Sequence, residues 1–323
     1  MKNLQNKVLV IGAGAWGSAV SSLLGENGCE VFLSVNDADL AVEINQNNRN
    51  SKYLPNVVLS KNIKAVKGFV NDVDFVFIVV PSSAAREVFT KIAQTKFKEN
   101  TVFVICSKGI EAASLKLLSD VFEEVVSSKN YAVLSGPNFA AEVANGVPSV
   151  TTVASASKEV AAQVIAILDN ENFKAQYSEN VRGSEVCGVV KNIIAIACGM
   201  TDGLGFGVNT KAAAVLKGVK EIQEICKALG ASADVASAAG FGDIFLTCSS
   251  AKSRNNSLGK IIAQGGKRDT NTTYEGAVAA GLISELAKKL KLRLDLCEAV
   301  NKILSNNLSQ DQIKKEIIAA ILK

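Results

Sequence analysis

The first half of the chain alternates short apolar runs with segments in which apolar residues recur at helical spacing. The apolar runs are rich in β-branched and aromatic residues and nearly continuous, as in strands buried on both faces. They lie at residues 7–12, 30–33, 74–80, 101–106 and 131–134, with weaker candidates at 149–154 and 173–177. The helical segments lie at residues 15–27, 38–48, 83–97, 112–126 and 157–169. Because crossovers join strands that alternate with helices, this order predicts a doubly wound, mostly parallel sheet.

The pattern changes near residue 184, where the short apolar runs stop. Long segments rich in Ala, Leu, Ile, Lys and Glu follow, separated by glycine-rich joints, as expected for amphipathic or buried helices. These segments lie at residues 185–200, 210–229, 276–290 and 310–322, with joints at 202–207 and 239–242. We therefore expect an α/β chain of two domains, a doubly wound sheet domain over residues 1–184 and an all-helical domain over residues 185–323.

A glycine pattern, G-x-G-x-x-G, directly follows the first predicted strand and opens the first predicted helix. Gly12 would permit a tight turn, Gly14 the close approach of a pyrophosphate, and Gly17 the packing of the helix near the strand. The helix N-terminus supplies amide groups and a partial positive charge. The alternative is a purely structural glycine turn. Because the pattern stands between a strand and a helix and a second strand follows, we expect a Rossmann-type domain that binds a dinucleotide.

The end of the second predicted strand should select between NAD and NADP. Asp37 lies 20 residues after Gly17, about where an acidic group for the ribose hydroxyls is expected. Asn36 could contact the ribose instead, and Asp37 could simply cap the helix that begins at Ala38. No arginine or lysine stands at these positions to neutralise a 2′-phosphate. The sequence therefore favours NAD over NADP.

The composition excludes several kinds of active site. The chain has no histidine, which rules out histidine-based metal sites, Ser-His-Asp and Cys-His nucleophiles, and dehydrogenases with an imidazole base. Proton transfer near neutral pH must therefore come from Lys, Asp, Glu, Cys or Tyr. The seven cysteines are widely spaced and form no C-x-x-C pair, so we expect buried thiols in a reducing compartment rather than disulfides or a metal site.

Charge and hydropathy limit the classes of binding partner and the cellular compartments that fit this chain. The net charge of +4 is mild and is not gathered into one run, so it indicates an anionic small molecule rather than nucleic acid. The first apolar run leads straight into glycines rather than into a cleavage site, unlike a signal peptide. No apolar stretch approaches the roughly 20 residues that span a bilayer. We expect a cytoplasmic protein without membrane insertion.

The clearest candidate for proton transfer is Lys191. Its segment, residues 186–197, is apolar on nearly every helix face except at Lys191 and Asn192. A lysine there either extends to solvent or points into a cleft at the domain junction. Partial desolvation lowers the pKa of an ammonium group and can make it a general acid and base near neutral pH. The alternative is a solvated lysine at a helix edge.

A second polar cluster follows a glycine-rich joint. Ser253, Arg254 and Asn255 place a hydroxyl, a guanidinium and an amide next to one another. This set suits a phosphate or a carboxylate, because arginine can bind two oxygens at once. Asp243 could accept a hydrogen bond from the lysine ammonium or from a substrate hydroxyl. The alternative is an ordinary polar loop that caps a helix at Leu258.

Two predicted strand ends carry further polar groups. Lys108 follows the strand at 101–106, and residues 136–138 follow the strand at 131–134. Open α/β sheets bind ligands at this edge, although either feature alone is more often a surface lysine or a turn.

Together these motifs resemble one family closely, the bacterial-type NAD(P)-dependent glycerol-3-phosphate dehydrogenases. The resemblance runs in order along essentially the whole chain, and several motifs are specific to this family rather than to Rossmann proteins generally. They are GAGAWG at residues 12–17, VPS at 80–82, SKGI at 107–110, LSGPNFAAE at 134–142, VKNI at 190–193, GLGFG at 203–207, NT at 209–210, AGFGD at 239–243, LTC at 246–248, SRN at 253–255 and EG at 275–276.

The resemblance implies a substrate, sn-glycerol 3-phosphate, and a role in supplying it for phospholipid synthesis. It implies that Lys191 exchanges a proton with the C2 oxygen. It places around the substrate Lys108, Gly136, Lys191, Asp243, Ser253, Arg254 and Asn255, to which we add Asn138. It places around the dinucleotide Gly12, Gly14, Trp16, Gly17, Lys108, Ala140, Arg254 and Glu275, to which we add Ala15 and Asn36. From the composition we expect no metal, and a homodimer formed through the helical domain is a further expectation.

Two positions depart from the family pattern. The family usually has arginine where this chain has Asn36, which weakens the case for NADP, and commonly has serine or threonine where it has Asn138. Another dehydrogenase of this architecture, acting on a β-hydroxy acid or a sugar acid, is an alternative, although the SRN set favours a phosphate ester. A dinucleotide-binding redox sensor without turnover is a third interpretation, and Lys191 inside an apolar helix argues against it.

Overall fold

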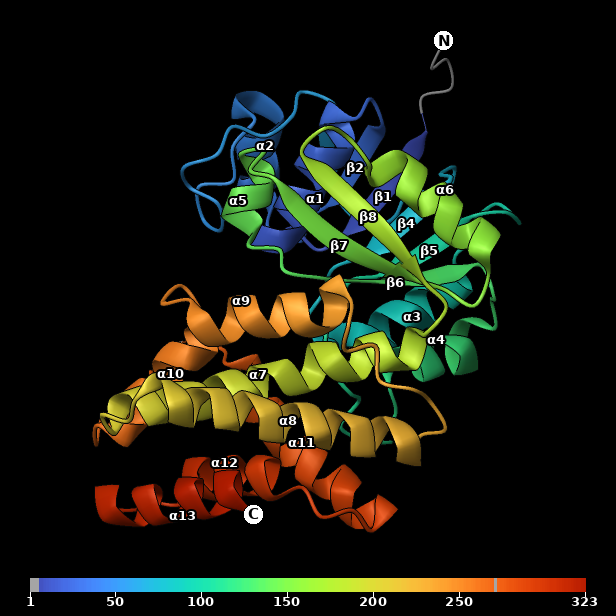
Figure 1. Cartoon of the computed structure of the whole chain (residues 1–323). Helices are drawn as coiled ribbons and strands as arrows, with labels where there is room; N and C mark the ends of the chain where they lie inside the picture. Colours follow the sequence, from blue (N-terminus) through green and yellow to red (C-terminus); the bar gives the residue numbers. More distant parts are fainter. Residues whose placement is uncertain (1–5, 270–271) are drawn as a thin grey trace. The chain divides into compact units, whose positions relative to one another are not determined.

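The computed structural model describes residues 6–269 and 272–323. The chain forms two compact units. The first comprises the residues up to Glu111 together with Leu118–Val181, and the second comprises Ala112–Leu117 together with Arg182–Lys323. The first unit is α/β and the second is built from helices (Figure 1).

The first unit is built on an eight-stranded sheet with the order β3-β2-β1-β4-β5-β6-β7-β8. Neighbouring strands are parallel except β6 and β7, which are antiparallel, so the predicted doubly wound, mostly parallel sheet is confirmed. The strands are β1 (Lys7–Ile11), β2 (Glu30–Ser34), β3 (Ile63–Val66), β4 (Phe75–Ile78), β5 (Val102–Ile105), β6 (Tyr131–Ser135), β7 (Ser149–Ala154) and β8 (Phe173–Ser178).

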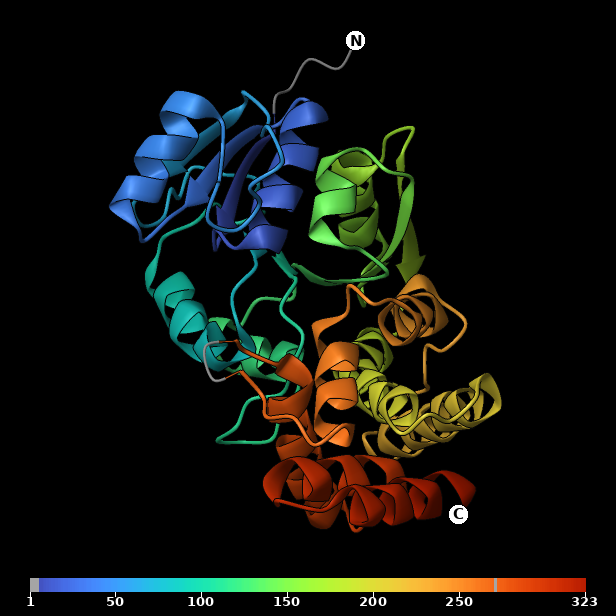
Figure 2. The same ribbon diagram turned by 90° about the vertical axis from the view of Figure 1, so that its left-hand side faces the viewer.

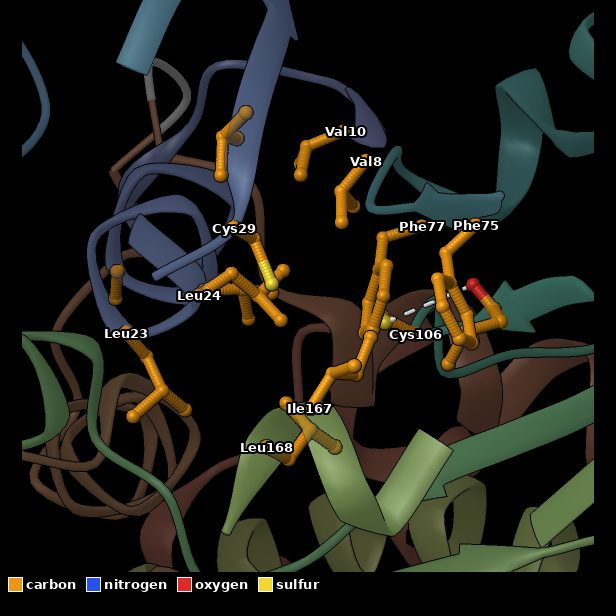
Figure 3. Packing of buried hydrophobic residues seen from close by; sticks show 14 of the residues in the cluster. Val8, Val10, Leu23, Leu24, Cys29, Phe75, Phe77, Cys106, Ile167 and Leu168 are labelled. Atoms are coloured by element: carbon orange, nitrogen blue, oxygen red, sulfur yellow. Dashed lines mark hydrogen bonds between the residues drawn. The ribbon is translucent and has the colours of Figure 1, made fainter. Parts of the chain in front are cut away.

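Both faces of the central strands are covered. Val8 and Val10 of β1 belong to one buried apolar cluster, and Leu9 and Ile11 belong to another. Because successive side chains of a strand point to opposite faces, each face has its own core. Figure 3 shows the first cluster, in which Val8 and Val10 lie near Phe77 of β4.

The helices of the first unit correspond to the predicted segments with two differences. They are α1 (Ala15–Glu26), α2 (Ala38–Asn47), α3 (Ala85–Gln94), α4 (Leu118–Val126), α5 (Ala140–Ala144) and α6 (Lys158–Leu168), with a short 3₁₀ turn at Ser82–Ala84. The predicted helix at 112–126 begins only at Leu118, because Leu115 has a left-handed backbone with φ of 59°. The short helix α5 was not predicted.

The second unit contains helices and, in its described residues, no strand. They are α7 (Val181–Gly203), α8 (Val208–Ala228), α9 (Asp243–Ser249), α10 (Arg254–Ala263), α11 (Glu275–Leu290), α12 (Asp295–Ser305) and α13 (Gln310–Leu322), with a π-helical turn at Ala238–Gly242 before α9. Helices α12 and α13 pack side by side, as their red ribbons show in Figure 2.

Helix α7 corrects one expectation. By length and composition it could cross a membrane, whereas the sequence pattern predicted no such stretch. Its most apolar window is 89% buried inside the protein, as in the core helix of a globular domain. The helix also carries Lys191.

Candidate active site

The glycine turn between β1 and α1 is closed toward the sheet and open at Gly14. Gly12 has a φ of 111°, and a Cβ there would lie 2.3 Å from the carbonyl oxygen of Val79. A Cβ on Gly17 would lie 1.8 Å from the carbonyl oxygen of Gly12. Apart from the residues next to Gly14 in the chain, no described atom lies within 4 Å of a Cβ placed on Gly14. The turn therefore fits a pyrophosphate at the N-terminus of α1, where dinucleotides bind in this fold.

The first residues of α1 complete this turn. Ala15 and Trp16 are partly buried and pack against the adjoining apolar cluster. Among the described residues, no side chain caps the N-terminus of α1, so its amide groups are not engaged by a capping side chain.

The end of β2 places Asp37 as the N-cap of α2, with Oδ1 accepting a hydrogen bond of 3.2 Å from the Leu40 amide. Asp37 also faces a cation, because Lys52 Nζ lies 2.9 Å from its Oδ2. The strand end itself carries no lysine or arginine, but a loop brings Lys52 there from fifteen residues along the chain. Hydrogen bonds from Lys52 and from the backbone of Leu40 lower the pKa of Asp37, so its carboxylate is ionised at neutral pH. Asn36 is exposed beside it.

The ends of β5 and β6 bring Lys108 and Gly136 together. Lys108 Nζ lies 3.5 Å from the carbonyl oxygen of Gly136. The Lys108 loop is fixed by Ser107, whose Oγ donates to the Val80 carbonyl at 2.5 Å. Both lie at the carboxyl edge of parallel strands, the usual ligand edge of such sheets.

Asn138 and Ala140 follow on the same side. The Asn138 amide donates a 3.0 Å hydrogen bond to the carbonyl of Val150 in β7, which ties the β6 end to the next strand. Ala140 begins α5 and is partly buried. The Asn138 side chain thus supports the loop in addition to any ligand contact.

Lys191 is enclosed by the helical unit. The residue is only 8% exposed, and Asp243 is 1% exposed. Lys191 Nζ lies 2.5 Å from Asp243 Oδ1 and donates to Thr247 Oγ1 at 3.1 Å. Asp243 and Thr247 are four residues apart in α9, so they share one face of that helix. The nearby carboxylate favours the ammonium form of the lysine, which is the form that can donate a proton.

Thr247 was not assigned a role from the sequence. Its Oγ1 lies 2.6 Å from the Asp243 carbonyl oxygen and 3.3 Å from Asp243 Oδ1, so it bridges the ion pair. The only sequence signal was its place in the LTC motif, four residues after Asp243.

Helices α7 and α10 touch backbone to backbone. A Cβ on Gly199 would lie 1.9 Å from the carbonyl oxygen of Asn256, and a Cβ on Gly259 would lie 2.0 Å from that of Ile196. Only glycine allows this approach, which sets the N-terminus of α10 against α7.

Asn255 joins three helices at this crossing. Its Nδ2 donates a 2.9 Å hydrogen bond to Asn192 Oδ1, next to Lys191. Its Oδ1 accepts a 3.1 Å hydrogen bond from the amide of Gly276 in α11. Asn255 is buried, and this arrangement gives it a positioning role whatever else it contacts.

The remaining predicted residues surround this junction. Ser253 is the N-cap of α10, with its Oγ accepting from the Asn256 amide at 3.2 Å, so the capping alternative describes its geometry. The helix that it caps starts at Arg254, four residues before Leu258. Arg254 and Glu275 are exposed at the first positions of α10 and α11.

The described residues show neither a metal-binding cluster nor an exposed cysteine thiol. Within residues 6–269 and 272–323, no group of three or more His, Cys, Asp or Glu side chains is placed to hold a metal ion. All seven cysteines are buried and unpaired by disulfides.

Comparisons with known proteins agree along the whole chain. The family model for the NAD-dependent glycerol-3-phosphate dehydrogenase N-terminus matches residues 7–161, and that for the C-terminus matches residues 180–315. A glycerol-3-phosphate dehydrogenase (NAD(P)+) from Erythrobacter litoralis is 38% identical over 305 residues, 93% of this chain and 92% of the relative. Its counterpart from Caulobacter vibrioides is 35% identical and covers 98% of both chains.

Solved structures give the same result. Glycerol-3-phosphate dehydrogenase from Coxiella burnetii superposes with a TM-score of 0.90 at 30% identity, covering 97% of this chain and 99% of that one. The Saccharomyces cerevisiae enzyme has a TM-score of 0.82 at 26% identity, with the same coverage. D-mandelate dehydrogenase, at 17% identity and a TM-score of 0.64, shares the fold alone. The chain belongs to the NAD-dependent glycerol-3-phosphate dehydrogenase family.

Proposed function

We propose that this protein interconverts sn-glycerol 3-phosphate and dihydroxyacetone phosphate with a nicotinamide dinucleotide, and that Lys191 transfers the proton. The observation that carries the proposal is the buried contact of Lys191 with Asp243 and Thr247. An ammonium held against a carboxylate in a chain without histidine is suited to general acid–base catalysis at a carbonyl oxygen. Membership of the family supplies the substrate class.

The dinucleotide would be bound chiefly by the first unit. The open face of Gly14 and the N-terminus of α1 suit its pyrophosphate. Once bound, the nicotinamide supplies or accepts the hydride. The residues that we assign to the whole dinucleotide are Gly12, Gly14, Ala15, Trp16, Gly17, Asn36, Lys108 and Ala140, with Arg254 and Glu275. We assign NAD as the preferred form, because Asp37, which follows the end of β2 and caps α2, carries an ionised carboxylate.

Lys191 would act at the oxygen of substrate C2. In the reducing direction its ammonium stabilises the growing negative charge on that oxygen and then donates a proton, and in the oxidising direction the neutral amine accepts one. Asp243 orients Nζ and keeps the ammonium form available, while Thr247 fixes its direction. Lys191 and Asp243 are buried, so competing water is largely excluded and their charges interact more strongly than they would in water.

The phosphate of the substrate would bind at the N-terminus of α10. Arg254 is exposed there and can bind two phosphate oxygens, and the helix dipole favours an anion. Ser253 and Asn255 flank it, and Lys108, Gly136 and Asn138 are the further proposed substrate contacts. Binding the phosphate away from C2 converts binding energy into alignment of the reacting carbon. The product would serve cytoplasmic phospholipid synthesis.

A substrate panel tests this proposal. Dihydroxyacetone phosphate should be reduced with loss of NADH absorbance, whereas 3-hydroxy acids and 6-phosphogluconate should not be oxidised. Arg254→Ala should raise the KM for dihydroxyacetone phosphate by about tenfold or more with a smaller effect on kcat, because it removes a bidentate anion contact. Turnover of a 3-hydroxy acid, or no turnover of either dihydroxyacetone phosphate or sn-glycerol 3-phosphate, would overturn the assignment.

A further inference from the structure

The ion pair between Asp37 and Lys52 lies where the adenosine ribose of a dinucleotide is expected. Ser34, the last residue of β2, is paired with Ile11 at the end of β1, so the segment that leads to Asp37 leaves the sheet next to the glycine turn. Lys52 Nζ contacts Asp37 Oδ2 at 2.9 Å and lies 5.5 Å from the centre of the Tyr53 ring. The pair was not evident in the sequence, because a loop rather than β2 supplies the lysine.

The loop that carries Lys52 is anchored to both neighbours of the ribose position. Asn50 is fully buried, and its Nδ2 donates to the carbonyl oxygen of Ala13 at 2.9 Å and to Ser18 Oγ at 2.7 Å. On the other side, the Ser51 amide donates to the carboxylate of Glu43 in α2 at 3.3 Å. These bonds fix the origin of the Lys52 side chain relative to the glycine turn and to α2.

The pair itself is exchangeable. The side chains of Lys52 and Asp37 are 55% and 41% exposed, so water competes for both partners. A long, solvated lysine can therefore leave Asp37 for a stronger anion without disturbing the loop, whose anchors are Asn50 and Ser51.

The two forms of the cofactor would meet this pair differently. The ribose of NAD offers hydroxyls that can donate to the Asp37 carboxylate while Lys52 keeps its partner. The 2′-phosphate of NADP adds close to two negative charges beside Asp37, which repels it, and Lys52 is the cation already placed there. One side chain of the pair thus disfavours the phosphate, and the other offers it a charge-assisted hydrogen bond.

We propose that Lys52 is the residue through which this chain accepts the 2′-phosphate of NADP, and that Asp37 opposes it, so that the pair sets the cofactor preference. This inference rests on the proposed function, because it assigns residues to the same dinucleotide. It replaces the single-residue interpretation of Asp37 with a balance of two opposed charges.

Binding of nucleotide fragments to the whole protein tests the proposal without turnover. Calorimetric titration with 2′,5′-ADP and with 5′-AMP isolates the contribution of the 2′-phosphate. Lys52→Met should weaken 2′,5′-ADP about tenfold or more and change 5′-AMP by less than about threefold. Asp37→Asn, which keeps an N-cap side chain, should tighten 2′,5′-ADP by about tenfold.

Lys174→Met is the matched control. Lys174 is an exposed lysine in the same unit, lies 3.7 Å from a carboxylate oxygen of Asp169, and belongs to β8 at the opposite edge of the sheet from β3. It should leave both affinities unchanged. Kinetics should follow the titrations, with Lys52→Met raising the KM for NADPH and not that for NADH.

The outcomes separate this inference from the proposed function. If the protein reduces dihydroxyacetone phosphate but Lys52→Met weakens both fragments equally or neither, the role of Lys52 is overturned and the function stands. If neither fragment binds the wild-type protein and no cofactor supports turnover, the proposed function fails together with the inference.

Discussion

Replacing Gly259 with alanine should displace the anion end of the candidate site while leaving each helix intact. Helices α7 and α10 cross at this residue, and an alanine Cβ would lie 2.0 Å from the carbonyl oxygen of Ile196. Ordinary contact begins at 3.4 Å, so α10 must move away from α7 by about 1.4 Å, the difference between the two distances.

Moving α10 away from α7 should lower both the stability and the activity of the protein. It would stretch the 2.9 Å hydrogen bond between Asn255 and Asn192 beyond bonding length. Overpacking costs about 1–3 kcal/mol, and a lost buried hydrogen bond costs about as much again. Alanine recovers about 1 kcal/mol of helix propensity, which leaves a net destabilisation of about 1–5 kcal/mol. Because Arg254 moves with α10 and Lys191 stays on α7, kcat/KM should fall about 10²-fold.

Urea unfolding and steady-state kinetics with dihydroxyacetone phosphate measure the two effects. Gly281→Ala is the control, because this glycine also lies inside a helix, and outside that helix the nearest described atom to its Cβ would be Asn301 Oδ1 at 3.8 Å. It should gain up to about 1 kcal/mol and keep wild-type kinetics. A Gly259→Ala protein as stable and as active as the wild type would refute the argument that this crossing positions the site.

Three further predictions concern buried polar groups. Asp243→Asn should lower the unfolding free energy by about 3–5 kcal/mol, because it removes the carboxylate that faces the buried Lys191 ammonium. Adding Lys191→Met should restore most of that loss in urea unfolding, whereas additive losses would contradict a direct pair. Glu221→Ala should cost about 2–4 kcal/mol in thermal unfolding, because its carboxylate accepts the amides of Leu296 and Cys297 at 2.6 and 3.0 Å, and an unchanged Tm would contradict this capping. Burial raises the pKa of the thiols of Cys106, Cys187, Cys226 and Cys297, so little thiolate forms as the pH rises to about 9. Ellman's reagent should therefore label the native protein slowly and should label seven thiols after denaturation, and rapid labelling of the native protein would contradict this burial.

The sheet could be predicted because its strands carry their own signal. Strands such as β1 and β4 are buried on both faces and are therefore continuous apolar runs. The edge strand β3 was missed because Lys64 is exposed between Ile63 and Ala65, which breaks such a run. Helix α12 was missed because its N-terminal amides are capped by Glu221, some 75 residues earlier, and its own N-cap residue, Leu294, provides no capping side chain.

In the candidate site, too, some residues carry a local sequence signal and others are brought together only by the fold. Lys191 could be singled out because a charged residue interrupts an otherwise apolar helix, and the glycine pattern because its spacing serves a defined turn. The contacts that give these residues their setting are long-range, such as that of Lys191 with Asp243, 52 residues away. Lys52 reaches Asp37 from a loop, and no local pattern encodes that approach.

The kcat of Lys191→Met for reduction of dihydroxyacetone phosphate tests the central claim most directly. NADH binding, followed through the emission of Trp16, the only tryptophan of the chain, should be retained and confirms an intact dinucleotide site. The account predicts a fall in kcat of about 10²-fold or more with NADH still bound. Turnover close to that of the wild type would contradict the assignment of Lys191 as the proton donor and acceptor.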